Sequence, residues 1–315
     1  MIKLIILSLL ALSYQSASAQ LVTESFGSGA NAFTIDFVTI GNPGNAPDTT
    51  GNPNPAGSVN YIYNIAKYEM SRDVVTKVNS STSSPPFIMD DLSGWGGNGL
   101  NRPATGLTWN KVAQFVNGLN IMKGATGAYN FDLNGDLKPW DSSSAGFNAS
   151  NPYRNSLAKF FLPSSNEFYK AAFGSPDGSW YDYATGSDAI PFAVISGTDP
   201  NTAVYNNRVG PADVMNAGGL SAWGTMAQSG NVWEITESAT DGFNDAGRER
   251  KEMRGGAWST GTADLSSAER TNAEPYAGYG SPDVGFRIAM VPEPSLHSLL
   301  ALGGLALAFK KRRQA

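Results

Sequence analysis

Three short stretches near the end of the chain combine ion-binding side chains with glycines that shape the backbone. They are Gly230-Asn-Val-Trp-Glu234, Arg254-Gly-Gly-Ala-Trp258 and Gly285-Phe-Arg287. In the first stretch, backbone carbonyls and the Glu234 carboxylate could together bind calcium, which takes oxygen ligands. Alternatively, Glu234 pairs with an arginine such as Arg254 or Arg287 inside the fold. The sequence leaves both interpretations open.

The two arginines each lie beside a glycine and an aromatic residue on predicted strands. A guanidinium there either recognises an anion or a peptide carbonyl in a pocket, or it satisfies buried carbonyls and carboxylates. We favour the structural role for Arg254 and Arg287, because a core built from many loops leaves many carbonyls that need donors. The aromatic residues of the same stretches are predicted to anchor this core; they are Trp233, Trp258 and Phe286.

The cysteine and histidine counts exclude several kinds of chemistry. The chain has no cysteine and one histidine, His297. Disulfides, thiolate metal sites and thiol nucleophiles are therefore absent. A histidine cluster for zinc, copper or iron and a Ser-His-Asp triad in the body of the chain are excluded as well. Any metal must use oxygen ligands, which points to calcium or a similar hard cation.

Composition indicates a folded body with many loops. Hydrophobic residues make up 41% of the 315 residues, enough for a sizeable core, whereas only 16% are charged. The 35 glycines and 18 prolines favour a mixed or largely β fold over a helical bundle. The formal net charge of −5 argues against a nucleic-acid partner, because phosphates require a basic surface.

The first 19 residues have the pattern of a secretory signal peptide. Lys3 precedes an apolar run over residues 4–12, and Ala17-Ser-Ala19 provides a small-residue cleavage site before Gln20. The alternative is a buried N-terminal strand, but the three features occur in the order expected of a signal. The mature chain is therefore predicted to begin at about residue 20.

The last 25 residues, 291–315, have the pattern of a C-terminal sorting signal. Pro292-Glu293-Pro294 is followed by a mainly apolar stretch over residues 296–309 and then by four basic residues, 310–313. About 14 apolar residues are fewer than the ~20 that cross a bilayer, so we expect only transient membrane retention. The tail resembles the PEP-CTERM sorting signal. That resemblance implies cleavage and transfer by an exosortase at the inner membrane of a Gram-negative bacterium that makes exopolysaccharide.

Between these ends, the elements that position the three stretches can be read from periodicity. Residues 32–40 and 61–69 are predicted strands. Val112, Phe115, Val116 and Leu119 mark one face of a helix over residues 110–119. Ser164 and Glu167 form a capping box that begins a second helix. Residues 284–290 alternate as a last strand, with Phe286 on one face and Arg287 on the other. We expect one domain over residues 20–290, with its core from about residue 30.

Six pieces in order carry a family resemblance over most of this domain. They are residues 63–71, 102–109, 161–172 (Phe-Leu-Pro-Ser-Ser-Asn-Glu-Phe-Tyr-Lys-Ala-Ala) and the three stretches named first. Together the chain resembles the formylglycine-generating enzyme / sulfatase-modifying factor family. The resemblance implies an α+β, C-type-lectin-like fold that is rich in loops, with short strands and few helices.

The resemblance also assigns roles to particular residues. It implies a structural calcium site with the carbonyls of Gly230 and Val232 and the side chain of Glu234 as ligands. Active members bind copper through a cysteine pair downstream of the Arg-Gly-Gly strand. Here that stretch, Ser259 to Arg270, contains no thiol, and serine and threonine do not replace a soft thiolate for copper(I). We therefore expect neither copper nor iron, and no oxidase activity of the family's kind.

The sequence thus predicts an exported protein of the cell surface or extracellular matrix. Its domain would have a binding or structural role without catalysis, with exopolysaccharide or another surface protein as partner. One alternative is an enzyme of unrecognised chemistry that uses Asp241, Asp245 or Glu234 with a hard metal. Another is an accessory factor for a second exported protein.

Overall fold

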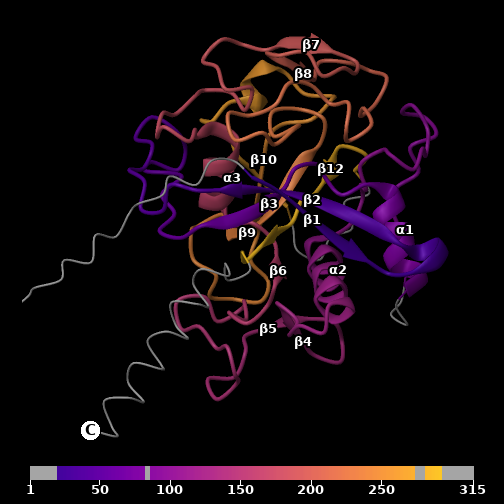
Figure 1. Ribbon diagram of the computed structural model, residues 1–315, viewed down its shortest axis with the longest axis vertical. Coiled ribbons are helices and arrows are strands. Elements are labelled where there is room, and N and C mark those ends of the chain that lie inside the picture. Colours follow the sequence, from indigo (N-terminus) through magenta and orange to yellow (C-terminus); the bar gives the residue numbers. More distant parts are fainter. Residues whose placement is uncertain (1–19, 82–85, 274–280, 293–315) are drawn as a thin grey trace, which may run out of the picture.

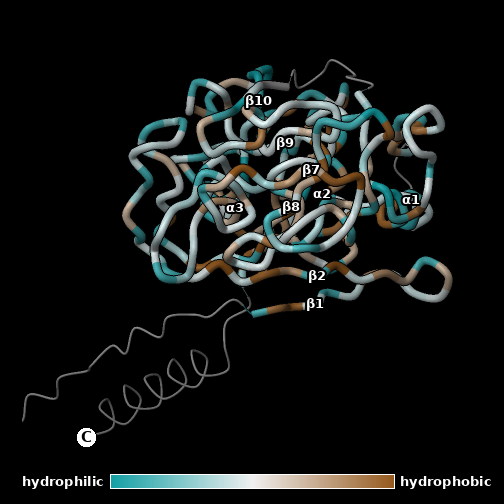
Figure 2. Tube along the Cα trace, turned by 90° about the horizontal axis from the view of Figure 1, so that it is seen from above, coloured by the Kyte–Doolittle hydropathy of each residue, from teal (hydrophilic) through white to brown (hydrophobic). Residues whose placement is uncertain are grey.

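A computed structural model of the protein describes residues 20–81, 86–273 and 281–292 (Figure 1). One antiparallel sheet has the strand order β1-β2-β3-β13-β6. Its strands are β1 (Leu21–Phe26), β2 (Phe33–Ile40), β3 (Tyr63–Ala66), β13 (Ala289–Met290) and β6 (Phe160–Phe161). The first and last strands of the described chain therefore share a sheet. Figure 2 shows β1 and β2 at one border of the molecule, with hydrophobic residues along β2.

A second sheet has the order β11-β10-β9-β12, in which β9 and β12 run parallel. Its strands are β9 (Trp233–Ala239), β10 (Lys251–Arg254), β11 (Thr271–Ala273) and β12 (Val284–Gly285). Residues 286–288 lead from β12 to β13 and so from one sheet to the other. The predicted single strand over residues 284–290 is therefore wrong. The chain crosses between two sheets there, and Arg287 is buried between them.

In the described ranges there are three α-helices, α1 (Arg72–Ser81), α2 (Trp109–Met122) and α3 (Ser165–Phe173). The predicted apolar stripe of α2 is confirmed, and the Phe115 ring lies 5.3 Å from the ring of Phe286. The capping box of α3 is also confirmed. The Ser164 hydroxyl accepts from the Glu167 amide at 3.3 Å, and the Glu167 carboxylate accepts from the Ser164 amide at 2.6 Å.

Short pieces complete the fold and leave long loops between them. β4 (Asn130–Phe131) pairs with β5 (Leu137–Lys138), and β7 (Phe192–Val194) pairs with β8 (Thr202–Val204). Two 3-10 turns are η1 (Gly29–Asn31) and η2 (Thr262–Leu265). Figure 1 places β7 and β8 at one end of the molecule and β4 and β5 at the other.

The predicted signal peptide and the predicted sorting tail lie almost wholly outside the described residues. This holds for the leader, 1–19, and for residues 293–315 of the tail, whereas Val291 and Pro292 are described. The Val291 amide donates to the carbonyl of Lys159 at 3.0 Å, so the chain stays attached to the fold up to this point. Within the described ranges, each helix is too short or too polar to cross a membrane.

Candidate functional site

Glu234, near the start of β9, forms a two-pronged ion pair with Arg287. Arg287 Nε donates to Glu234 Oε2 at 2.5 Å, and Nη2 donates to Oε1 at 2.6 Å. The same guanidinium donates to the carbonyls of Ala66 at 3.0 Å and Met226 at 2.7 Å. Both charged side chains are buried. Of the two interpretations of Glu234, pairing with an arginine is the one present, and Arg287 ties both sheets together.

A second buried carboxylate, Glu69, lies beside this pair. It accepts from Asn231 Nδ2 at 2.5 Å and from the Val232 amide at 3.2 Å. Burial raises the pKa of Glu69, and the negative charge of Glu234 raises it further, while Arg287 and these hydrogen bonds oppose the shift. Burial also raises the pKa of Glu234 against the effect of Arg287. Two buried carboxyl groups therefore lie within electrostatic reach of one guanidinium, and only Glu234 bonds it.

The predicted calcium ligands Gly230, Val232 and Glu234 lie in and just after the turn that enters β9. Both Glu234 oxygens accept from Arg287, so the carboxylate as placed does not fit a calcium site unless the cation displaces the guanidinium. Among the described residues, no group of three or more histidine or acidic side chains is arranged to hold a metal. Calcium at this segment stays a prediction.

Arg254 has a different partner from Arg287. Its Nε donates to Glu252 Oε1 at 2.5 Å, and Arg270 Nη1 donates to Glu252 Oε2 at 2.9 Å. Ser165 Oγ also donates to Glu252 Oε1 at 2.5 Å, which fixes the start of α3 against β10. Among the predicted anchors, Trp233, Trp258 and Phe286 are all buried. The ring of Trp258 lies 5.0 Å from the half-exposed ring of Trp95.

A third polar cluster was not predicted from the sequence. Arg154 Nη1 lies 3.5 Å from Glu237 Oε2 and 3.8 Å from Glu167 Oε2. Tyr61 donates its hydroxyl to Glu167 at 2.8 Å, and Tyr129 donates to Glu237 at 2.9 Å. Arg154 comes from a loop without periodicity, so only one signal could have indicated the cluster. Glu237 lies three positions after Glu234 in the same strand segment, and a carboxylate that is buried there needs a partner.

The charged groups in this cluster shift one another's pKa values. Burial raises the pKa of Glu237, and Arg154 opposes the shift. Burial alone would lower the pKa of Arg154, but the charges of Glu237 and Glu167 outweigh it and raise that pKa. Arg154 therefore stays charged, and two carboxyl groups offset it.

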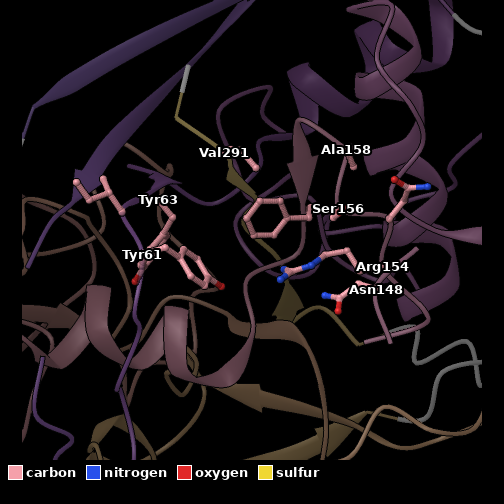
Figure 3. Close-up of a pocket in the computed structure, with 10 residues that line it drawn as sticks. Tyr61, Tyr63, Asn148, Arg154, Ser156, Ala158 and Val291 are labelled. Carbon is pink, nitrogen blue, oxygen red and sulfur yellow. The ribbon is translucent and has the colours of Figure 1, made fainter. Parts of the chain in front are cut away.

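The unpredicted cluster borders open space, whereas Glu234 and Arg287 do not. A pocket of about 300 Å³ is lined by Tyr61, Arg154, Asn148, Phe161 and Val291, among others. Figure 3 shows Tyr61 and Tyr63 on one side of this pocket and Arg154, Asn148, Ser156 and Ala158 on the other. A second pocket of about 320 Å³ shares Arg154 and includes Asn151, Glu237 and Phe243. This region is a candidate for binding a ligand.

Known structures agree with this fold. The chain is similar to Treponema denticola variable protein 1, at 20% identity and a TM-score of 0.55, over 86% of this chain and 99% of that one. It is also similar to CarF, at 17% identity and a TM-score of 0.58, over 82% and 99% of the two chains. PvdO from Pseudomonas aeruginosa matches at 15% identity and a TM-score of 0.52, over 85% and 98%. The predicted loop-rich α+β, C-type-lectin-like fold is confirmed.

The sequence also matches a domain family. Residues 59–291 match the sulfatase-modifying factor enzyme 1-like domain, and the chain belongs to this family. No curated protein sequence matches the chain. The predicted family is thus confirmed for the body of the protein. At such low sequence identities, the solved structures show a shared fold and nothing more.

Proposed function

We propose that the protein is exported and held at the surface or in the extracellular matrix of a Gram-negative bacterium. There its sulfatase-modifying-factor-like domain binds or supports a partner and does not oxidise cysteine. The leader pattern in residues 1–19 and the Pro292-Glu293-Pro294 tail support export, brief retention at the inner membrane, and handling by an exosortase-type enzyme.

The absence of a thiol after the Arg-Gly-Gly strand carries the non-catalytic part of the proposal. The chain has no cysteine, yet the stretch from Ser259 to Arg270 is folded. Thr260 Oγ1 accepts from the Ala257 amide at 3.0 Å, and Leu265 is buried. This stretch uses its side chains for packing and turns, and a hydroxyl does not replace the thiolate that copper(I) requires.

The partner would be exopolysaccharide or another surface protein. The alternative of a carboxylate enzyme with a hard metal gains no support from the described residues, because Asp241 and Asp245 are exposed whereas Glu234 is buried. A role as accessory factor for another exported protein would also use a binding surface, and co-purification would identify it.

Export and the missing activity can be tested with the full chain in a Gram-negative host that has an exosortase. We expect the chain in the surface or medium fraction with a mass that lacks the tail. A matched chain with Pro292, Glu293 and Pro294 changed to alanine should stay with the inner membrane. Equal distribution of the two chains would contradict the proposed sorting.

The same preparation tests the chemistry. Incubated with copper(I), oxygen and a cysteine-containing sulfatase peptide, the protein should leave the peptide mass unchanged. Conversion of the cysteine to an aldehyde would overturn the non-catalytic assignment.

A further inference from the structure

Three adjoining depressions, two of them lined by Arg154, form one extended feature, the Arg154 groove. The pocket that contains Arg154 and Tyr61 has about 300 Å³. A neighbour of about 300 Å³ shares Tyr61 and contains Ser164. The third, of about 320 Å³, shares Ser164 with the second and Arg154 with the first. Shared lining residues make the three adjacent, so the groove suits a chain-like ligand better than a single small molecule.

The lining of the groove is rich in amide and hydroxyl side chains with aromatic rings between them. Tyr61 is 42% exposed and Phe243 69% exposed, so both aromatic residues reach solvent. The amide and hydroxyl groups are Ser58, Asn60, Asn148, Ser150, Asn151, Ser156, Ser164, Asn166, Ser238 and Asn244. Such a surface offers stacking together with many neutral hydrogen bonds.

Arg154, Asn148 and Asn151 add hydrogen-bonding groups to the lining of this groove. Arg154 lines the first and third depressions, Asn148 the first and Asn151 the third. The Arg154 side chain is held by Glu237 at 3.5 Å and keeps about one-fifth of its surface exposed. A ligand hydroxyl donates one hydrogen bond and accepts others, so it can pair with a guanidinium and with either end of an amide.

The charge balance disfavours an anionic ligand. Glu167 and Glu237 both lie within 4 Å of the Arg154 guanidinium, at 3.8 and 3.5 Å. An anion entering the groove would meet these carboxyl groups as well as the arginine, and Asp245 lines the third depression. A neutral ligand avoids that repulsion.

We propose that the Arg154 groove binds a neutral polysaccharide chain, with sugar faces on Tyr61 and Phe243 and hydroxyl groups on Arg154, Asn148 and Asn151. This rests on the proposed function, because it names the ligand of the proposed non-catalytic domain. The groove lies on residues 58–63, 148–166 and 237–245, away from the stretch after the Arg-Gly-Gly strand.

The test is affinity electrophoresis of the purified full chain in gels that contain dextran, pullulan or galactomannan, with alginate as the acidic comparison. Phe243→Ala removes an exposed ring from the groove. Phe192→Ala removes a ring that is 73% exposed on β7, at the opposite end of the molecule from β4 and β5, and is the matched control. We expect at least one neutral polymer to retard the wild type and the control alike. Phe243→Ala should bind it about tenfold more weakly.

Several outcomes would contradict the proposed binding of a neutral polysaccharide in the Arg154 groove. These are no retardation by any neutral polymer, stronger retardation by alginate, or equal binding by Phe243→Ala and wild type. Asn148→Ala provides a second variant, in the first depression, and should also weaken binding while the melting temperature shows that it folds. The export experiment is independent of this one. Export without glycan binding contradicts only the proposed ligand of the groove. Glycan binding without export contradicts only the proposed function.

Discussion

At the scale of single residues, Arg287 connects separate parts of the fold. It neutralises Glu234, donates to the carbonyl of Ala66 at the end of β3 and to that of Met226 ahead of β9, and lies beside Glu69. Removing one partner of a buried ion pair typically costs about 3–5 kcal/mol, because the other charge stays buried. The stretch Gly285-Phe-Arg287 therefore works as an internal link between two sheets.

Gly230 is predicted to be needed for a close backbone approach, and Gly224 allows a matched comparison. Both have left-handed φ values, +104° and +97°. A Cβ on Gly230 would lie 2.6 Å from the Val204 carbonyl oxygen, whereas one on Gly224 meets nothing within 4 Å. Alanine at either site strains the backbone by about 1–2 kcal/mol. G230A should lose a further ~1–3 kcal/mol through the clash.

Urea unfolding of G230A and G224A measures this difference directly. Equal losses of the free energy of unfolding in the two variants would show that the approach to Val204 does not matter.

At the scale of elements, regular helices could be predicted and very short strands could not. The stripe over Val112 to Leu119 spans two turns, and the capping box at Ser164 has a fixed spacing, so both helices follow from local physics. β13 has two residues and no period of its own. Its place between β3 and β6 depends on pairing with segments more than 100 residues away. The alternation of apolar and polar residues along 284–290 contains no information about that pairing.

The same reason limits prediction of the candidate site. Glu234 and Arg287 stand in recognisable stretches, and pairing with an arginine was one of two open interpretations. The Arg154 cluster joins a loop, the start of α3 and the end of β9. Its residues are far apart in sequence and share no motif, so only the tertiary fold brings them together.

Asn120 gives a prediction at this scale, because one side chain holds α2 to β6. Its Oδ1 accepts from the amides of Lys159 and Phe160 at 2.9 and 3.0 Å, and its Nδ2 donates to the Phe160 carbonyl at 2.8 Å. Asn120→Leu removes these three bonds and the bond from Nδ2 to the Val116 carbonyl, all inside the core. We expect a loss of about 2–4 kcal/mol in the free energy of unfolding.

The neighbouring Ile121→Ala is the control, since Ile121 is 69% exposed and should change stability by no more than ~0.5 kcal/mol. Chemical denaturation measures both variants, and hydrogen exchange at Phe160 reports the β6 contact itself. An Asn120→Leu variant as stable as the control would contradict this role for the side chain.

At the scale of the whole molecule, both ends of the described fold lie at the same end of the strands of the five-stranded sheet. The Gln20 carbonyl accepts from the Thr39 amide at 2.8 Å, Thr39 pairs with Asn64, and Asn64 pairs with Met290. Three strand spacings separate these ends, about 14 Å. Val291 continues from this end of β13 and lines the Arg154 groove. The proposed removal of leader and tail would therefore act at the side of the molecule that carries the groove.

The position of β13 predicts where the tail can be removed without loss of the fold. A chain of residues 20–292 keeps β13, and its residues Ala289 and Met290 are almost fully buried, as is Ile288 before them. A chain of residues 20–287 loses the strand between β3 and β6 and leaves both with unpaired edges. Burial of Ile288 and Met290 alone stabilises by roughly 1.5–3 kcal/mol each. That is a large share of a typical ~5–15 kcal/mol of stability.

We expect the longer chain to melt cooperatively and the shorter one to lose its near-ultraviolet circular dichroism. Cooperative melting of the shorter chain within a few degrees of the longer would show that β13 does not hold the sheet together.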